Sequence, residues 1–167
     1  MGLFDMFKTD AGDQLTPHLA FASSLIYMMA SDGEIDNEEV GHLLSVLGGA
    51  SSDGGSIGVG AQNKQLLQKA QQIVRTMPID QFLQQATPIL TPAQKLCILV
   101  NLIDSSLADG QAEIEEQQLF HKFLQAFGMS EQEFMPYFQV ISLKHDKSVF
   151  IDPNHPSNQP GFSVNLG

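Results

Sequence analysis

The pattern of hydrophobic and polar positions along the 167-residue chain indicates helices throughout. Residues 17–30 are almost all apolar or small, and a helix that is apolar on every side is usually a buried one. A second strongly apolar run covers residues 93–108. Each run follows a Thr-Pro pair, a common helix start in which threonine caps the helix and proline takes its first position. No stretch alternates as a half-buried strand does, so the sequence predicts an all-α fold.

Caps and glycines set the limits of the remaining helices. Ser130 and Glu133 have the spacing of a capping box, and Gly128 is placed to end the preceding helix. Pro136 lies inside the last predicted helix, where a proline can introduce a kink. We therefore expect a bundle of about seven helices, at residues 17–30, 36–47, 62–77, 79–86, 93–108, 113–127 and 131–143.

Length and local composition predict the domain organisation. A chain of this length usually forms one domain, which we place at residues 1–145. Residues 48–61 are rich in glycine and serine and are typical of a flexible linker inside that domain. Residues 146–167 are rich in proline, asparagine and serine, and we expect an extended tail that either packs as a strap or stays loose.

Charge and cysteine content exclude several classes of protein. With 19 acidic and 8 basic residues the formal net charge is −11, which disfavours nucleic acid as a partner and suits metal cations or basic protein surfaces. The single Cys97 cannot form an internal disulfide, and its apolar surroundings in the sequence predict a core position. Neither a membrane span nor a signal peptide is recognisable, so we expect a cytoplasmic protein.

The chain also contains an internal repeat. The pairs Asp32-Gly33 and Asp109-Gly110 each follow an apolar helix and precede an acid-rich helix start. At the same offset Asp36 matches Glu113 and Glu39 matches Glu116. The repeat predicts two similar helix hairpins, and a pseudo-two-fold axis between them would bring both acidic turns to one end of the bundle.

Three interpretations of these acidic residues remain open. Acidic residues at a helix start cap free backbone N–H groups and interact favourably with the helix dipole. Crowded carboxylates can instead bind a divalent cation, or they can form a docking face for a basic partner. We do not expect an EF-hand, because Met28 and Ala30 would occupy its first two ligand positions. The candidate metal ligands are Asp32, Asp36, Glu39, Asp109, Glu113 and Glu116.

The ligand types limit which cation is expected. Carboxylate oxygens suit calcium or magnesium, whereas participation of His42, three residues after Glu39, would favour zinc. Helix capping does not explain Asp104, which lies within an apolar run. Either this carboxylate has a partner, a metal or a raised pKa, or its side of the helix is exposed.

Signatures of catalysis are missing from the sequence. It contains neither a phosphate-binding glycine loop nor a Gly-x-Ser-x-Gly motif. We therefore expect no enzyme and no organic cofactor.

Several short motifs resemble the TerB-like proteins of bacterial tellurite resistance. They are Ala30-Ser-Asp-Gly followed by Glu39, Ala108-Asp-Gly followed by Glu116, the helix end Ala126-Phe-Gly, and the opening Met1-Gly-Leu-Phe-Asp-Met-Phe-Lys. The similarity spans roughly residues 1–140, and the glycine-rich linker and the tail depart from it. Asp32, Glu39, Asp109 and Glu116 match the paired Asp-Gly…Glu positions, and Asp36 and Glu113 match them less strictly.

The resemblance implies a non-catalytic helical bundle with an acidic, metal-associated surface. It also implies a role in the tellurite or general chemical-stress response, beside protein partners that include membrane-associated ones. A related helical module occurs in membrane-anchored DnaJ-like co-chaperones, so the alternative is a protein-docking module without metal.

Overall fold

The computed structural model describes residues 14–33, 43, 63–108, 110 and 112–166. These residues contain six α-helices and no strand, which confirms the all-α prediction. The helix expected at residues 36–47 and the linker expected at residues 48–61 lie outside the described residues, apart from Leu43. The helices are α1 Pro17–Met29, α3 Asn63–Thr76, α4 Ile79–Ala86, α5 Pro92–Leu107, α6 Ile114–Phe127 and α7 Glu131–His145.

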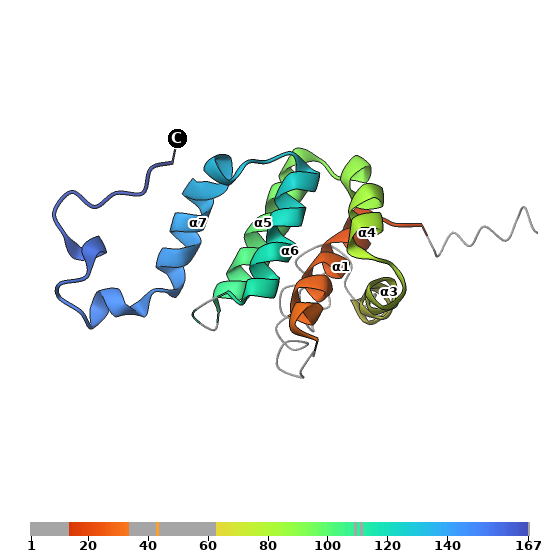
Figure 1. Cartoon of the computed structure of the whole chain (residues 1–167), viewed down its shortest axis with the longest axis horizontal. Coiled ribbons are helices and arrows are strands. Elements are labelled where there is room, and N and C mark those ends of the chain that lie inside the picture. The colour runs from red at the N-terminus through yellow and green to blue at the C-terminus, as the bar shows by residue number, and fades with distance from the viewer. Residues whose placement is uncertain (1–13, 34–42, 44–62, 109, 111, 167) are drawn as a thin grey trace, which may run out of the picture.

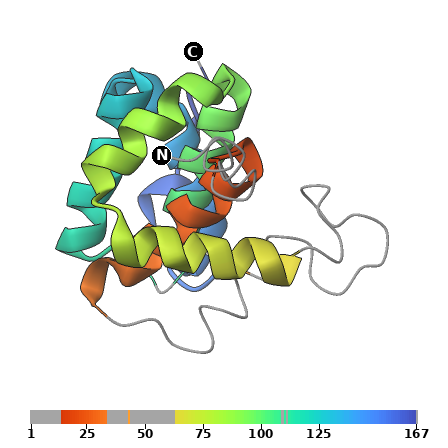
Figure 2. The ribbon, with the colours of Figure 1, turned by 90° about the vertical axis from the view of Figure 1, so that its right-hand side faces the viewer.

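Helix α1 lies in the centre of the bundle. Every residue from Leu19 to Met29 is buried, as its uninterrupted apolar sequence predicted. The helix packs against α3 on one side and α5 on the other (Figure 1). Figure 2 shows α3 crossing the bundle on the side away from α7. A helix surrounded in this way needs no polar face, and its buried Ser24 donates a hydrogen bond to the Ala20 carbonyl at 2.6 Å.

Aromatic side chains join α1, α4 and α6 inside the core. The ring centroids of Tyr27 and Phe82 are 4.9 Å apart, and those of Phe82 and Phe123 are 6.4 Å apart. The Tyr27 hydroxyl donates a hydrogen bond to the Met77 carbonyl at 2.5 Å, so its polar end is satisfied. Burial raises the pKa of Tyr27 to about 12, because the phenolate would lose its hydration.

The predicted helix starts at Thr16, Thr91 and Ser130 are confirmed in detail. Thr16 accepts a hydrogen bond from the Leu19 amide, and Thr91 and Ser130 each begin a capping box. Gly128 follows α6 in the left-handed conformation, with φ 71°. Helix α7 continues through Pro136 to His145. Local sequence therefore fixes these boundaries, since each cap uses atoms only a few residues away.

The first helices of the two repeats end at the same edge of the bundle. Helices α1 and α5 lie side by side and both finish at the lower edge of Figure 1. After α1 a short 3₁₀ helix, η2 (Ala30–Asp32), leads to Gly33 with φ 96°, and Gly110 after α5 has φ 104°. Positive φ values are accessible to glycine at little cost, which explains the glycine of each Asp-Gly pair.

Residues 146–166 run outward from the end of α7, at the left of Figure 1. They form two short 3₁₀ helices and an ion pair of 2.9 Å between His155 Nε2 and Asp146 Oδ2. Phe162 and Val164 line a surface hollow together with Met135 and Phe138 of α7. Phe150 and Ile151 remain largely exposed. None of the helices in the described part of the chain is both long and apolar enough to cross a membrane.

Candidate functional site

The structure describes only part of the predicted metal ligands. Asp36, Glu39 and Asp109 lie outside the described residues, and so does His42. Asp32 is the last residue of η2, and of this residue the structure describes the backbone alone. Glu113 and Glu116 lie at the start of α6, where both side chains are described.

Helix capping accounts for the arrangement of Glu113 and Glu116. Glu113 is the exposed N-cap residue of α6. The Glu116 carboxylate reaches back and accepts a hydrogen bond from the Glu113 amide at 2.7 Å. A carboxylate at this position satisfies an amide without an intrahelical partner and lies at the positive end of the helix dipole.

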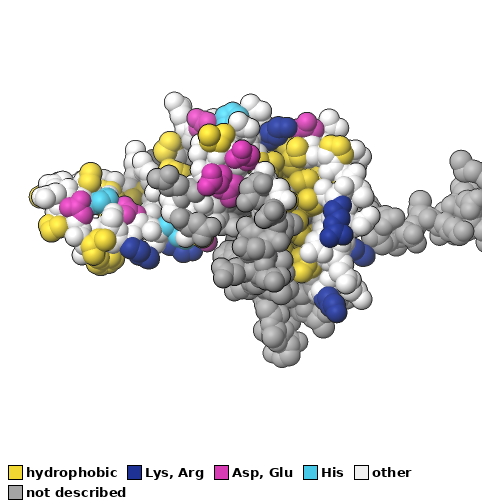
Figure 3. Space-filling view, turned by 60° about the horizontal axis from the view of Figure 1, so that its bottom comes forward, with side chains coloured by type: hydrophobic (Ala, Val, Ile, Leu, Met, Phe, Trp, Pro, Cys, Tyr) yellow, Lys and Arg dark blue, Asp and Glu magenta, His cyan; other side chains and the backbone are white. Residues whose placement is uncertain are grey.

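The turn after α1 packs against α6, whose first turns carry the second set of acidic residues. Residues of η2 contact α6, and Ala30 and Ser31 line the same surface depression as Glu115 and Gln118. Acidic side chains gather near the middle of this side of the molecule in Figure 3. Within the described ranges no three His, Cys, Asp or Glu side chains are grouped to hold a metal ion. The acids that are described here offer oxygen ligands only, which fit calcium or magnesium.

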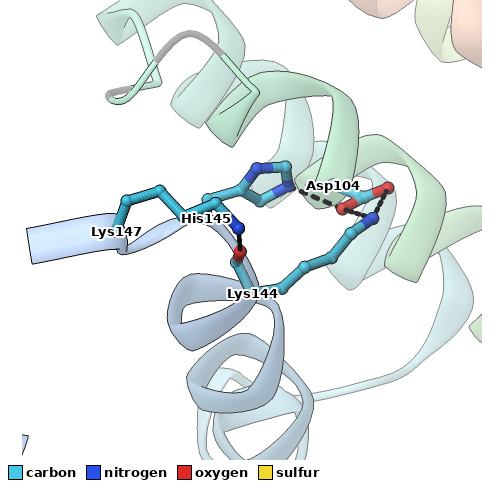
Figure 4. A network of polar contacts seen from close by, with 4 residues as sticks. All are labelled: Asp104, Lys144, His145 and Lys147. Atoms are coloured by element: carbon cyan, nitrogen blue, oxygen red, sulfur yellow. Dashed lines mark hydrogen bonds and ion pairs between the residues drawn. The ribbon is translucent and has the colours of Figure 1, made fainter. Parts of the chain in front are cut away.

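Asp104 is bound by other side chains of the protein, which the sequence did not identify. Its carboxylate receives hydrogen bonds from Lys144 Nζ at 2.8 and 2.9 Å and lies 2.7 Å from His145 Nε2 (Figure 4). Lys147 Nζ extends this network by donating to the Lys144 carbonyl at 2.9 Å. Both partners of Asp104 belong to the last turn of α7, so the cluster joins α7 to α5.

The electrostatics of Asp104 favour its charged form. Burial alone would raise the pKa of this carboxyl, whose side chain is 24% exposed, but the hydrogen bonds and positive charges of Lys144 and His145 lower it further than burial raises it. Asp104 is therefore a carboxylate with protein partners, which was one of the possibilities that the sequence left open. Its pKa is lowered, not raised. The sequence carried no signal for this cluster, because its members are some 40 residues apart.

A larger hollow separates α6 from α7. Helix α5 packs against both of them, and their closest ring contact is Phe120–Phe134, with centroids 5.1 Å apart. The resulting groove has a volume of about 500 Å³ and a mostly apolar lining. The sequence analysis did not predict this groove. The available signal was that residues 131–143 contain more apolar residues than a single core-facing stripe of a helix needs. Its apolar walls include Ile103, Leu107, Phe120, Leu124, Phe134, Met135 and Phe138.

The expected core position of Cys97 is wrong. Its side chain is exposed and lines a small hollow with His18 and Gln94. Cys97 lies on the same face of α5 as Asn101, whose amide donates to the Cys97 carbonyl at 2.8 Å. The core is reached instead by Ile98 and Leu102, about a quarter turn away. An apolar neighbourhood in sequence did not reveal which face of the helix the packing would cover.

Comparison with known proteins gives one clear result. The family model described as "Tellurite resistance protein TerB" matches residues 18–136. The match begins in α1 and extends into α7, and thus includes both Asp-Gly pairs and well over half of the chain. Neither the curated proteins nor the solved structures give a significant match.

Proposed function

The chain belongs to the TerB family of tellurite resistance proteins, and on that premise we propose that it acts without catalysis, by binding a divalent cation at its two Asp-Gly turns. Such a protein would serve the tellurite or general chemical-stress response in the cytoplasm. The proposed ligands come from Asp32, Asp36, Glu39, Asp109, Glu113 and Glu116.

One observation supports this site above all others: η2 packs against α6. The turn that contains Asp32 is thereby held near α6, which has Glu113 as its N-cap and Glu115 and Glu116 in its first turn. Carboxylates held close together repel one another, which lowers stability, and a bound cation reverses this effect. Their hard oxygen atoms favour calcium or magnesium, and a contribution from His42 would favour zinc.

Thermal unfolding with calcium, magnesium or zinc chloride tests the proposal. A cation at ten times its dissociation constant stabilises the native state by about 1.4 kcal/mol. For a domain of this size the melting temperature should rise by a few degrees. The double variant Asp32→Asn/Asp109→Asn should lose this rise and keep its helical circular dichroism. Asp80→Asn/Asp152→Asn removes the same charge elsewhere and should keep the rise. An unchanged melting temperature in the presence of each of the three cations would refute the site.

The exposed apolar surface of α7 favours a second candidate function, the docking of a protein partner. Met135, Tyr137 and Phe138 are 45%, 40% and 37% exposed, although all three are large and hydrophobic. Apolar side chains grouped on a surface often mark an interaction site. The partner would be a protein, soluble or membrane-associated, and not a nucleic acid, because the chain carries a net charge of −11. Docking predicts no dependence of the melting temperature on metal, which distinguishes it from the first candidate.

A further inference from the structure

We infer that the groove between α5, α6 and α7 binds an amphipathic helix of a partner protein, with its apolar face on the groove floor and Lys or Arg residues at both ends. This inference rests on the docking candidate above and gives it a site and a partner chemistry. The occupant is a helical segment of another protein rather than a second copy of this chain.

The shape of the groove fits a short helix. Helix α5 and the Phe120–Phe134 contact form its floor. Along α6 its lining extends from Glu116 to Leu124, a separation of eight residues, or about 12 Å of helix. A partner helix of two to three turns would cover that length with apolar residues at i, i+4 and i+7, as in other helix-in-groove complexes. Met135 and Phe138, both partly exposed, form the wall on α7.

The charges around the groove favour a basic occupant. Its lining includes Glu116 in the first turn of α6 and Glu131 in the first turn of α7. Because a short turn joins the end of α6 to the start of α7, these two first turns lie near opposite ends of α6. Besides these acids the lining contains His121, whose Nδ1 lies 3.2 Å from Glu131 Oε1, and among the described residues it contains no Lys or Arg. A second copy would bring another net charge of −11 to the same place, so charge complementarity favours a basic partner.

Binding of model peptides to the full chain tests the inference. The probe is a fluorescein-labelled 14-residue peptide of leucine and lysine, with the leucines on one helical face. A second peptide has glutamate in place of lysine, and a third has the first composition in a scrambled order without an apolar face. Fluorescence anisotropy is measured in 150 mM NaCl with excess EDTA, so that the outcome does not depend on a bound cation. The lysine peptide should bind at least tenfold more tightly than either of the others.

Two pairs of matched variants locate the site. Met135→Lys places a positive charge in the groove wall, whereas Val140→Lys makes a similar change at a residue of α7 that is similarly exposed and does not line the groove. Met135→Lys should weaken binding at least tenfold, and Val140→Lys less than twofold. Glu131→Gln should weaken binding two- to fivefold, and Asp152→Asn, the same charge change in the tail, should leave it unchanged. Circular dichroism of each variant should match the wild type.

Chemical shifts of methyl groups, measured by NMR, locate the site without the use of variants. On addition of the lysine peptide, shifts should concentrate at Leu107 and Leu124, which line the groove, and not at Leu19 in the central helix. Equal loss of binding in Met135→Lys and Val140→Lys, or equal binding of the glutamate peptide, would overturn the groove assignment. Wild-type binding of the lysine peptide would then still support docking on another face. Failure of every peptide to bind would overturn both the groove and the docking candidate.

Discussion

Replacing Asp104 with asparagine should destabilise the protein by releasing the end of α7 from α5. The carboxylate accepts hydrogen bonds from Lys144 at 2.8 and 2.9 Å and contacts His145 at 2.7 Å. Asparagine keeps the size of the side chain, but it removes the charge and turns one acceptor into a donor that faces Lys144. The substitution therefore isolates the electrostatic part of the contact between the two helices.

The size of the effect follows from the exposure of the partners. Hydrogen bonds to a charged group contribute about 1.5–3 kcal/mol when they are shielded from water, and exposed pairs contribute about 0–1 kcal/mol. The His145 side chain is 22% exposed and that of Lys144 is 61% exposed, so most of the loss should come from His145. We expect Asp104→Asn to lower the free energy of unfolding by about 1.5–2 kcal/mol and the melting temperature by about 5 °C.

The loss should also depend on pH. Because the pKa of Asp104 is lowered in the folded state, its contribution is present above the unfolded-state pKa of about 3.9 and is lost as the pH falls through the folded-state pKa. The difference in urea midpoint between wild type and Asp104→Asn should be full at pH 7 and should shrink below about pH 4.

Two comparisons make the reasoning refutable. Asp80→Asn breaks an exposed pair with Lys122 at 3.3 Å and should cost no more than about 0.5 kcal/mol. A double-mutant cycle of Asp104→Asn with His145→Gln should give a coupling energy of about 1 kcal/mol. An Asp104→Asn variant as stable as wild type at pH 7, or a coupling energy near zero, would show that packing alone joins α7 to α5.

Three further changes test the core, a cap and a turn. Phe123→Ala removes a side chain that is 0% exposed and should lower the free energy of unfolding by about 3–5 kcal/mol in urea; a loss below 1 kcal/mol would contradict the described core. Ser130→Ala removes the N-cap of α7 and should cost about 1 kcal/mol in the same assay, whereas an unchanged midpoint would show that the cap hydrogen bond adds nothing. Gly33→Ala, at φ 96° with no neighbouring atom within 4 Å, should cost about 1–2 kcal/mol through backbone strain alone, and a stabilised variant would exclude the left-handed turn.

The sequence was sufficient for the fold class and for most of the described helix boundaries. Thr16, Thr91 and Ser130 cap helices through atoms only three residues away, so their sequence context contains the whole interaction. The burial of α1 was equally readable, because a helix without a polar face has to be covered on all sides. The Asp-Gly repeat resembles the TerB family, and the family model matches residues 18–136, which include both pairs.

The candidate site was predictable only in part. The repeat indicated where acidic residues would gather, and η2 does pack against α6. Whether Glu116 binds metal stays a prediction, while its hydrogen bond to the Glu113 amide confirms capping at that position. For the groove between α6 and α7 the sequence shows only surplus apolar residues at 131–143, because periodicity indicates that a face is apolar but not whether a neighbour covers it.

By itself, then, the sequence determined what local hydrogen bonds and hydrophobic periodicity decide: which segments are helical, where they start and stop, and that α1 lies inside. Only the tertiary structure decided that Asp104 is paired with Lys144 and His145, and that Cys97 faces outward. The physical reason is that a helix boundary depends on atoms a few residues apart in the chain. The environment of a side chain depends on the rotation and spacing of whole helices, which are fixed by all their packing contacts together.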